Sequence, residues 1–282
     1  MTRIAAIQMI SSHDVASNLS GAARLISQTV DAGAKLVVLP ENFAIMPMKD
    51  AERLTVMEKA GTGPIQDFLY AQAQQHRIWL IGGTVPIVGS QRNKLHAACL
   101  LINDRGECVA RYDKIHLFDV KLETGEEYCE SATIEAGKDI VVTDTPLGRV
   151  GLAVCYDLRF PELFRQMLDD GAEIFAVPSA FTATTGKAHW DILVRARAIE
   201  NLAFLVASAQ GGVHSNGRET HGNTIVVNPW GEVLARLAQG PGFVIADIDR
   251  KRMHEMRSGL PSIEHRRLRH DEGVANGEKI PA

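Results

Sequence analysis

Cys155 is the residue of the chain best suited to nucleophilic chemistry. It follows a short apolar run, residues 150–154, that is typical of a buried strand, and Pro161 after it is typical of the first turn of a helix. A thiol on such a strand-to-helix turn lies at the edge of a sheet and near the positive end of a helix, which lowers a thiol pKa. The alternative is that Cys155 is simply a small, buried apolar residue.

Two charged residues follow other predicted strands and could act with this thiol. Glu41 comes directly after the apolar residues 36–40. Burial raises the pKa of a carboxylate and would make Glu41 a general base near neutral pH, whereas an ordinary loop carboxylate is the alternative. Lys114 ends an apolar and aromatic run, where its ammonium could stabilise an oxyanion or, alternatively, reach the surface. His116 is expected to be a structural hydrogen-bonding group rather than a base.

The elements that position these residues can be predicted from hydrophobic periodicity. Apolar residues at helical spacing predict helices, and short apolar runs predict strands. The helices are expected at 17–32, which Gly33 ends, and at 64–76, and the strands at 3–9, 36–40, 78–85, 95–102 and 108–114. Residues 116–138 show little periodicity, which predicts a long functional loop.

The second half of the chain repeats the first in the same order. Residues 30–40 are echoed by 168–178, residues 103–111 by 228–236, and residues 3–7 by 149–153. Each half alternates helices with strands that are apolar throughout, so both faces of each sheet must be covered. The sequence therefore predicts an α/β fold, a four-layer α-β-β-α sandwich with an internal pseudo-two-fold repeat; a single doubly wound sheet is the alternative. Glu41, Cys155 and Ser179 are expected to converge at the carboxyl ends of strands.

Composition narrows the class of protein. In 282 residues, 45% apolar and 23% charged side chains are typical of a globular protein with a substantial core. The net charge of -4 argues against a nucleic-acid partner, and no apolar run is long enough for a signal segment or a membrane span. The four cysteines form no Cys-x-x-Cys pair, which favours a reduced, cytoplasmic compartment. We expect one domain over residues 1–270 and a flexible tail over 271–282.

Several short motifs resemble those of the nitrilase superfamily of carbon–nitrogen hydrolases. They are Leu-Pro-Glu-Asn-Phe at 39–43, Tyr-Asp-Lys-Ile-His-Leu-Phe at 112–118, Val-Cys-Tyr-Asp-Leu-Arg-Phe-Pro-Glu at 154–162, Pro-Ser-Ala-Phe at 178–181, Gly-Lys-Ala-His-Trp at 186–190 and Arg-Ala-Arg-Ala-Ile-Glu-Asn at 195–201. The resemblance covers nearly the whole chain and implies the same α-β-β-α sandwich. It also implies a homodimer or higher homo-oligomer, assembled through the helices that follow the cysteine strand.

The resemblance assigns a role to each of the three candidates. Cys155 is the nucleophile, Glu41 the general base and Lys114 the oxyanion stabiliser. The thiolate attacks an amide carbon, ammonia leaves, and water hydrolyses the thioester that remains. The implied reaction needs no metal and no organic cofactor.

The resemblance also implies two supporting groups. Many members use a second glutamate in the loop after the lysine, and Glu130 aligns with it, with Glu126 and Glu127 as nearby rivals. The backbone N–H of Tyr156, directly after the nucleophile, is the expected second oxyanion donor.

The nucleophile motif distinguishes among branches of the superfamily. True nitrilases usually carry Cys-Trp-Glu, whereas this chain has Cys-Tyr-Asp at 155–157, which indicates an amidase. The chain is most similar to deaminated glutathione amidases and omega-amidases, and the serine in Pro-Ser-Ala-Phe at 178–181 favours the former. The expected substrate is a small 2-oxo acid amide of the deaminated glutathione type. 2-Oxoglutaramate and carbamoyl amines are the alternatives.

Such a substrate needs a pocket that holds carboxylates near the thiol. Arg159, in the turn after the nucleophile, could bind one, or could instead pair with Glu162 and shape the start of the helix. Phe43 and Phe181 are expected to form apolar walls of the pocket. The other residues expected to line it are Tyr156, Thr182, Thr184, Thr185 and His189.

Two functions of other classes stay open. Cys155 could act with His116 or His189 as its base, in a cysteine–histidine hydrolase or acyltransferase. Alternatively, the fold could be a non-catalytic scaffold that binds other proteins, with Cys155 no more reactive than an ordinary thiol.

Overall fold

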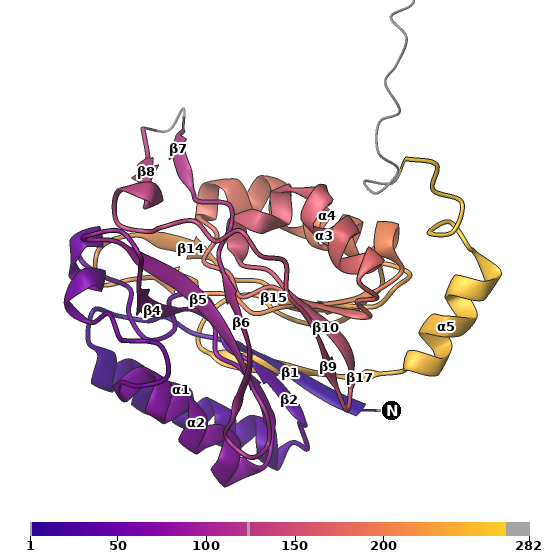
Figure 1. Cartoon of the computed structure of the whole chain (residues 1–282), viewed down its shortest axis with the longest axis horizontal. Helices are drawn as coiled ribbons and strands as arrows, with labels where there is room; N and C mark the ends of the chain where they lie inside the picture. Colours follow the sequence, from indigo (N-terminus) through magenta and orange to yellow (C-terminus); the bar gives the residue numbers. More distant parts are fainter. Residues whose placement is uncertain (1, 123–124, 269–282) are drawn as a thin grey trace, which may run out of the picture.

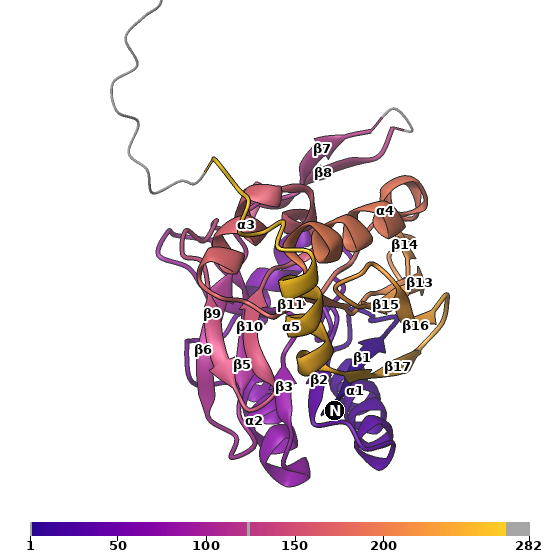
Figure 2. The same ribbon diagram turned by 90° about the vertical axis from the view of Figure 1, so that its right-hand side faces the viewer.

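Two β-sheets pack face to face and carry helices on their outer sides (Figures 1 and 2). The structure is a computed structural model in which residues 2–122 and 125–268 are described. One outer side is formed by α1 (Val15–Asp31) and α2 (Pro64–His76), and the opposite side by α3 (Pro161–Asp169) and α4 (Ala183–Asn201). The fold is therefore the predicted four-layer sandwich rather than a single doubly wound sheet.

The first sheet has the strand order β17-β1-β2-β3-β5-β4, with β6 paired to β5. Its strands are β1 (Thr2–Gln8), β2 (Leu36–Val38), β3 (Trp79–Ile81), β4 (Val85–Val88), β5 (Leu95–Ile102), β6 (Cys108–Asp113) and β17 (Gly242–Ile248). The strands β1, β2 and β3 are parallel, so their carboxyl ends lie at one edge of the sheet.

The second sheet has the order β16-β15-β12-β11-β10-β9. Its strands are β9 (Val142–Thr145), β10 (Gly148–Leu152), β11 (Ile174–Ala176), β12 (Phe204–Ala207), β15 (Thr224–Val227) and β16 (Val233–Leu237). Here β10, β11 and β12 form a second parallel triplet. The two triplets correspond to the internal repeat seen in the sequence.

Smaller elements surround the two sheets. They are the hairpin strands β7 (Asp119–Lys121) and β8 (Glu127–Cys129), the strands β13 (Gly211–Val213) and β14 (Glu219–His221), the 3-10 helices η1 (Asp50–Thr55), η2 (Glu130–Ala132) and η3 (Cys155–Arg159), and the helix α5 (Arg250–Gly259). Residues 116–138 are therefore not a loop alone, since the β7–β8 hairpin projects from the body there (Figure 1). Strands of three residues are too short to give a periodic pattern.

Apolar side chains of the strands alternate between two cores. In β1, Ile4 lies between the sheets in one cluster with Val150 of the second sheet. Its neighbour Ala5 points the other way, into a cluster that contains Ile26 of α1 and Leu69 of α2. Both faces of the strand are buried, which explains why the strands are apolar throughout.

The predicted strand at 78–85 is interrupted by Gly82 and Gly83, so that β3 ends at Ile81 and β4 begins at Val85. Gly83 has a φ of 56°, and a Cβ atom there would lie 2.1 Å from the carbonyl oxygen of Pro40. A glycine is required because the backbone after β3 touches the residue that precedes Glu41.

Within the described ranges, no helix combines the length and apolar character needed to cross a membrane. The tail predicted at 271–282 lies outside the described residues.

Candidate active site

Cys155 lies on a sharp turn directly after the second sheet's β10. Its φ is 49°, in the left-handed region that non-glycine residues rarely adopt, and its backbone N–H donates to the carbonyl of Pro178 at 2.9 Å. The helix α3 then begins at Pro161, as the sequence predicts. The turn exposes only 8% of Cys155.

A fully buried carboxylate, Asp157, fixes this turn. It accepts hydrogen bonds from the backbone N–H of Val154 at 2.8 Å and from the Tyr112 hydroxyl at 2.6 Å. It also accepts a hydrogen bond from the backbone N–H of His116 at 3.1 Å and lies 2.7 Å from the His116 Nδ1. The His116 ring stacks on Phe160, with centroids 3.7 Å apart. His116 is therefore a structural hydrogen-bonding group, and the Asp157 network joins the end of β6 to the cysteine turn.

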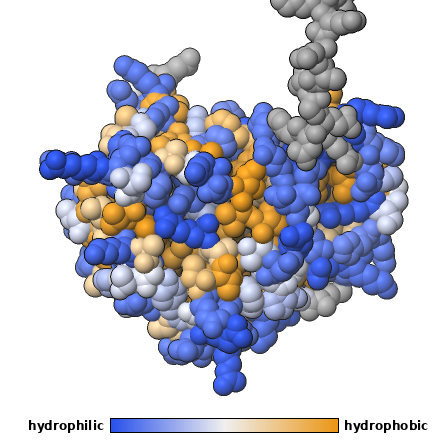
Figure 3. Space-filling model, in the orientation of Figure 1, coloured by the Kyte–Doolittle hydropathy of each residue, from blue (hydrophilic) through white to orange (hydrophobic). Residues whose placement is uncertain are grey.

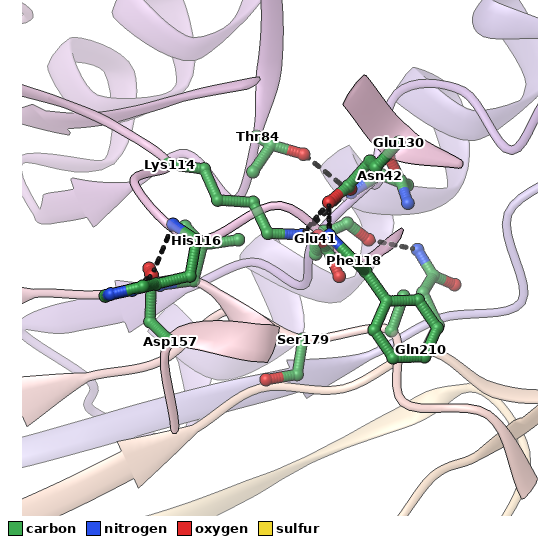
Figure 4. Close-up of polar contacts among 12 residues, drawn as sticks. Glu41, Asn42, Thr84, Lys114, His116, Phe118, Glu130, Asp157, Ser179 and Gln210 are labelled. Atoms are coloured by element: carbon green, nitrogen blue, oxygen red, sulfur yellow. Dashed lines mark hydrogen bonds and ion pairs between the residues drawn. The ribbon is translucent and has the colours of Figure 1, made fainter. Parts of the chain in front are cut away.

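Glu41 lies at the end of the first sheet's β2 and is 3% exposed. Its backbone carbonyl accepts a hydrogen bond from Gln210 Nε2 at 3.0 Å, and the next N–H, of Asn42, donates to Thr84 Oγ1 at 2.8 Å (Figure 4). The Glu41 side chain points toward the Lys114 ammonium. These backbone contacts hold the carboxylate at the junction of the two sheets.

Lys114 bridges two carboxylates. Its Nζ lies 2.8 Å from Glu41 Oε1 and 2.8 Å from both oxygens of Glu130, and the side chain is 1% exposed (Figure 4). Glu130 is held in turn by the Phe118 N–H, which donates to its Oε2 at 2.7 Å. Of the rival glutamates, Glu126 instead accepts from the Tyr128 hydroxyl at 2.9 Å. Glu130 is thus the loop glutamate that the structure brings to Lys114.

The expected rise in the pKa of Glu41 is wrong. Burial acts to raise that pKa, but the Lys114 ammonium and hydrogen bonds from Lys114 and Cys155 outweigh it, so the pKa lies below its ordinary value. Burial acts to lower the pKa of Lys114, but the carboxylates of Glu130 and Glu41 outweigh it. The pKa of Lys114 is therefore raised, and its ammonium stays charged. The resting site therefore contains an ion-paired glutamate rather than a neutral one.

The expected lowering of the pKa of Cys155 is also wrong. Burial and the Glu41 carboxylate raise the pKa of this thiol well above its ordinary value, against the opposing effects of Lys114 and the Ala180 backbone. Burial beside an anion outweighs the effect of a nearby helix end on a thiol pKa. The raised pKa favours the protonated form of the Cys155 thiol in the resting site.

These groups open into one pocket. Its lining residues are Glu41, Asn42, Asp50, Arg53, Lys114, Phe118, Tyr128, Cys129, Glu130, Cys155, Tyr156, Arg159, Ala180, Phe181, Thr182, Thr185 and Arg218. Among the described residues, no group of three or more His, Cys, Asp or Glu side chains is arranged to hold a metal ion.

Most of the predicted substrate-binding residues line this pocket, and three do not. Tyr156, Arg159, Phe181 and Thr182 line it, together with Thr185. The Arg159 guanidinium lies 5.8 Å from the Tyr156 ring centroid and 5.2 Å from that of Phe181.

Phe43, Thr184 and His189 are corrections to the predicted pocket. Thr184 is exposed, and its hydroxyl donates to Glu126 Oε1 at 2.7 Å. Phe43 is fully buried in the core under α1 and α2, with its ring 6.5 Å from that of Phe68. The positive φ of Asn42, 57°, turns the chain between Glu41 and Phe43. His189 is exposed on α4, where its Nδ1 lies 3.1 Å from Arg159 Nη1.

Sequence reasoning missed the lining residues Asp50, Arg53, Tyr128 and Arg218. They lie on η1, on the β7–β8 hairpin and next to β14, and a basic residue in a short, non-periodic segment is normally a surface residue. No local pattern marks Arg53 or Arg218 as part of a pocket.

Comparison with known proteins agrees with this geometry. Residues 3–258 match the carbon–nitrogen hydrolase family. A deaminated glutathione amidase of Synechocystis sp. is 42% identical over 265 residues, covering 93% of this chain and 97% of that protein, and the one of Homo sapiens is 39% identical over 268 residues, covering 94% and 82%. The crystal structure of Saccharomyces cerevisiae Nit3, a member of branch 10 of the nitrilase superfamily, matches with a TM-score of 0.85 at 29% identity, covering 95% of this chain and 97% of that one. The chain belongs to the carbon–nitrogen hydrolase family.

Proposed function

We propose that the chain is a cysteine-dependent amidase whose nucleophile, base and oxyanion stabiliser are Cys155, Glu41 and Lys114. Membership in the family makes it a hydrolase of carbon–nitrogen bonds other than peptide bonds, acting on a small amide and water. The observation that carries the assignment is the buried Lys114 ammonium, bound to Glu41 and Glu130 at the wall of the pocket that contains Cys155.

The reaction proceeds through a thioester. Glu41 accepts the Cys155 proton while the sulfur attacks the amide carbon, and Lys114 with the Tyr156 N–H stabilises the tetrahedral oxyanion. Glu41 then gives the proton to the amine nitrogen, and the carbon–nitrogen bond breaks. In the second half, Glu41 takes a proton from water, the resulting hydroxide attacks the thioester, and the acid is released as the Cys155 thiol is restored.

The pKa directions explain how a weakly basic Glu41 can take this proton. In the resting site, the lowered pKa of Glu41 and the raised pKa of Cys155 make transfer unfavourable. Once the oxyanion forms, it competes for the Lys114 ammonium, and the hold of Lys114 on Glu41 weakens. The basicity of Glu41 therefore rises together with the charge on the substrate, so that deprotonation and attack are coupled.

Deaminated glutathione is the substrate that we favour, because the relatives at 39% and 42% identity carry that activity in their names. Glutathione contains no primary amide, so hydrolysis of its deaminated form at the 2-oxo acid side sets free a cysteinyl amine. The expected release of ammonia therefore applies only to a primary amide such as 2-oxoglutaramate, the omega-amidase substrate. The identity of the released amine therefore separates the two activities.

The test measures product release from deaminated glutathione, 2-oxoglutaramate, a carbamoyl amine and a simple nitrile. We expect the wild type to hydrolyse deaminated glutathione fastest, and Cys155→Ala to abolish hydrolysis while its far-UV circular dichroism and melting temperature stay near those of the wild type. Activity that persists in Cys155→Ala would refute the nucleophile. Activity that is lost in His116→Ala but kept in Glu41→Gln would favour a cysteine–histidine hydrolase instead.

We further propose that the chain works as a cytoplasmic homodimer or higher homo-oligomer, assembled through the helices after the cysteine strand. Support comes from α4, where Ile192 is 69% exposed and Ile199 is 45% exposed. Apolar residues also gather across the centre of the face drawn in Figure 3. Light scattering on the wild type and on Ile192→Asp tests the assembly, with a monomeric wild type as the contradicting result.

A further inference from the structure

The pocket contains more basic than acidic side chains. The basic ones are Arg53, Lys114, Arg159 and Arg218, and the acidic ones are Glu41, Asp50 and Glu130. Lys114 is paired with both glutamates, and Arg53 Nη1 is paired with Asp50 Oδ1 at 2.6 Å. Within residues 2–122 and 125–268, Arg159 and Arg218 have no carboxylate at ion-pair distance. The pocket therefore has positive charge to spare for an anionic ligand.

Two of these arginines also have a buried nitrogen without a partner. The Nε atoms of Arg53 and Arg218 are inaccessible and have no hydrogen-bond acceptor within the described part of the chain. The Arg53 side chain is only 7% exposed. A buried donor left unpaired costs about 1–3 kcal/mol, and more when it is charged, so such donors normally have a partner in the functional state. Because both side chains line the pocket, a ligand carboxylate bound against their guanidinium groups is the matching partner.

The segments that carry these arginines are fixed against each other. Asn216, in the turn before β14, donates through Nδ2 to the carbonyl of Pro47 at 2.7 Å, just before η1. Arg218 Nη2 donates to the carbonyl of Ala180 at 2.7 Å, and its guanidinium lies 5.0 Å from the Tyr128 ring centroid. A guanidinium that is already oriented loses little entropy on binding an anion.

Arg218 also lies close to the reacting groups. Its charge helps to lower the pKa of Glu41. It also contacts the carbonyl of Ala180, whose backbone N–H hydrogen bonds to Cys155 and helps to lower the pKa of that thiol. Arg159 occupies a separate position, over the rings of Tyr156 and Phe181. The pocket thus offers two cationic positions within reach of one substrate.

We propose that Arg53 and Arg218 form a second anion subsite, which binds a carboxylate of the substrate other than the one that Arg159 binds. This inference rests on the proposed amidase function and specifies its substrate class: a dianionic amide, with one carboxylate for each cationic position. Deaminated glutathione has two carboxylates, on the 2-oxo acid and on the glycine, whereas 2-oxoglutaramate has one. The subsite therefore selects the longer substrate.

The test compares deaminated glutathione with its glycinamide form, in which the second carboxylate is replaced by a neutral amide. A charge-assisted hydrogen bond contributes about 1.5–3 kcal/mol, so the wild type should prefer the acid by about 10- to 100-fold in kcat/KM. In Arg218→Gln and Arg53→Gln this ratio should fall toward one, mainly through a higher KM for the acid. Arg159→Gln is the matched control, because it should weaken the binding of both substrates equally and preserve the ratio of their kcat/KM values.

Two further measurements keep the test decisive. The charge-matched double variant Asp50→Asn/Arg53→Gln replaces Arg53→Gln if the unpaired Asp50 prevents folding, and it should lose the same preference. Calorimetry on Cys155→Ala with each compound measures binding without turnover. A wild type that hydrolyses neither compound would refute the proposed function, but the calorimetry would still test the subsite. Equal binding of the two compounds, binding of neither, or a ratio unchanged in Arg218→Gln and the Arg53 variant would overturn the subsite.

Discussion

Replacing Glu41 by glutamine should move two properties of Cys155 in opposite directions. The Glu41 carboxylate raises the pKa of the Cys155 thiol, while the Lys114 ammonium lowers it. Glu41→Gln removes the first effect and leaves Lys114, with Glu130 as its remaining carboxylate. The thiolate fraction of Cys155 should therefore increase, while hydrolysis is lost for want of a base.

The size of both effects follows from the buried geometry. Two unit charges about 4 Å apart interact by about 4 kcal/mol at an effective dielectric constant of about 20, and even a third of that energy is a factor of about ten in an equilibrium. We expect alkylation of Cys155 by iodoacetamide at pH 8 to become at least about tenfold faster. Loss of general base catalysis should reduce kcat for amide hydrolysis by about 10²- to 10⁴-fold.

The assay resolves each cysteine by mass spectrometry of peptides, with the exposed Cys108 of β6 as the internal reference thiol. Glu130→Gln is the matched control, since Glu130 contacts Lys114 and the Phe118 N–H. It should change the alkylation rate less than Glu41→Gln does. An alkylation rate for Cys155 that is unchanged or slower in Glu41→Gln would refute the reasoning, because it would mean that the carboxylate activates the resting thiol.

Three other predictions concern the same network. Lys114→Met leaves Glu41 and Glu130 buried without a counter-ion and should lower the free energy of unfolding at pH 7 by about 3–5 kcal/mol in urea titrations; a loss below about 1 kcal/mol would contradict this. Because the pKa of Glu41 is lowered in the folded protein, Glu41 contributes its full stabilisation above its ordinary pKa and loses it as pH falls through the lowered value. Glu41 also stays ionised down to the same low pH, so the acid limb of the kcat/KM profile should lie below pH 4.5. A limb near pH 6.5 would indicate a histidine base instead. Tyr112→Phe removes the 2.6 Å hydrogen bond to Asp157 and should cost about 1–3 kcal/mol of stability with a lower kcat, and an unchanged urea midpoint would argue against that role.

Local sequence patterns were sufficient for most of the fold. The helix predicted at 64–76 and the strand at 95–102 have the bounds that the structure shows, and Pro161 begins α3. These features depend on which side chains are buried, and burial leaves a periodic trace in neighbouring residues. The internal repeat predicted the two-sheet sandwich for the same reason, since both faces of the strands are apolar.

The electrostatics of the site could not be predicted in this way. The partner that reverses the expected pKa shift of Glu41 is Lys114, 73 residues away in the chain. The position of Phe43 outside the pocket depends on the backbone turn at Asn42, and the sequence does not show this turn without the fold. Arg53 and Arg218 become neighbours of one pocket only through contacts between distant loops.

The arrangement of two glutamates around one lysine has a consequence for the direction of the reaction. Each turnover produces a new carboxylate next to Glu41 and Glu130, which already share the single positive charge of Lys114. The amide group of the substrate is neutral and enters without this repulsion. The carboxylate that replaces it is repelled by the two glutamates. We therefore expect the site to release its acyl product readily and to catalyse amide synthesis poorly, because the two glutamates beside Lys114 disfavour the return of the acid.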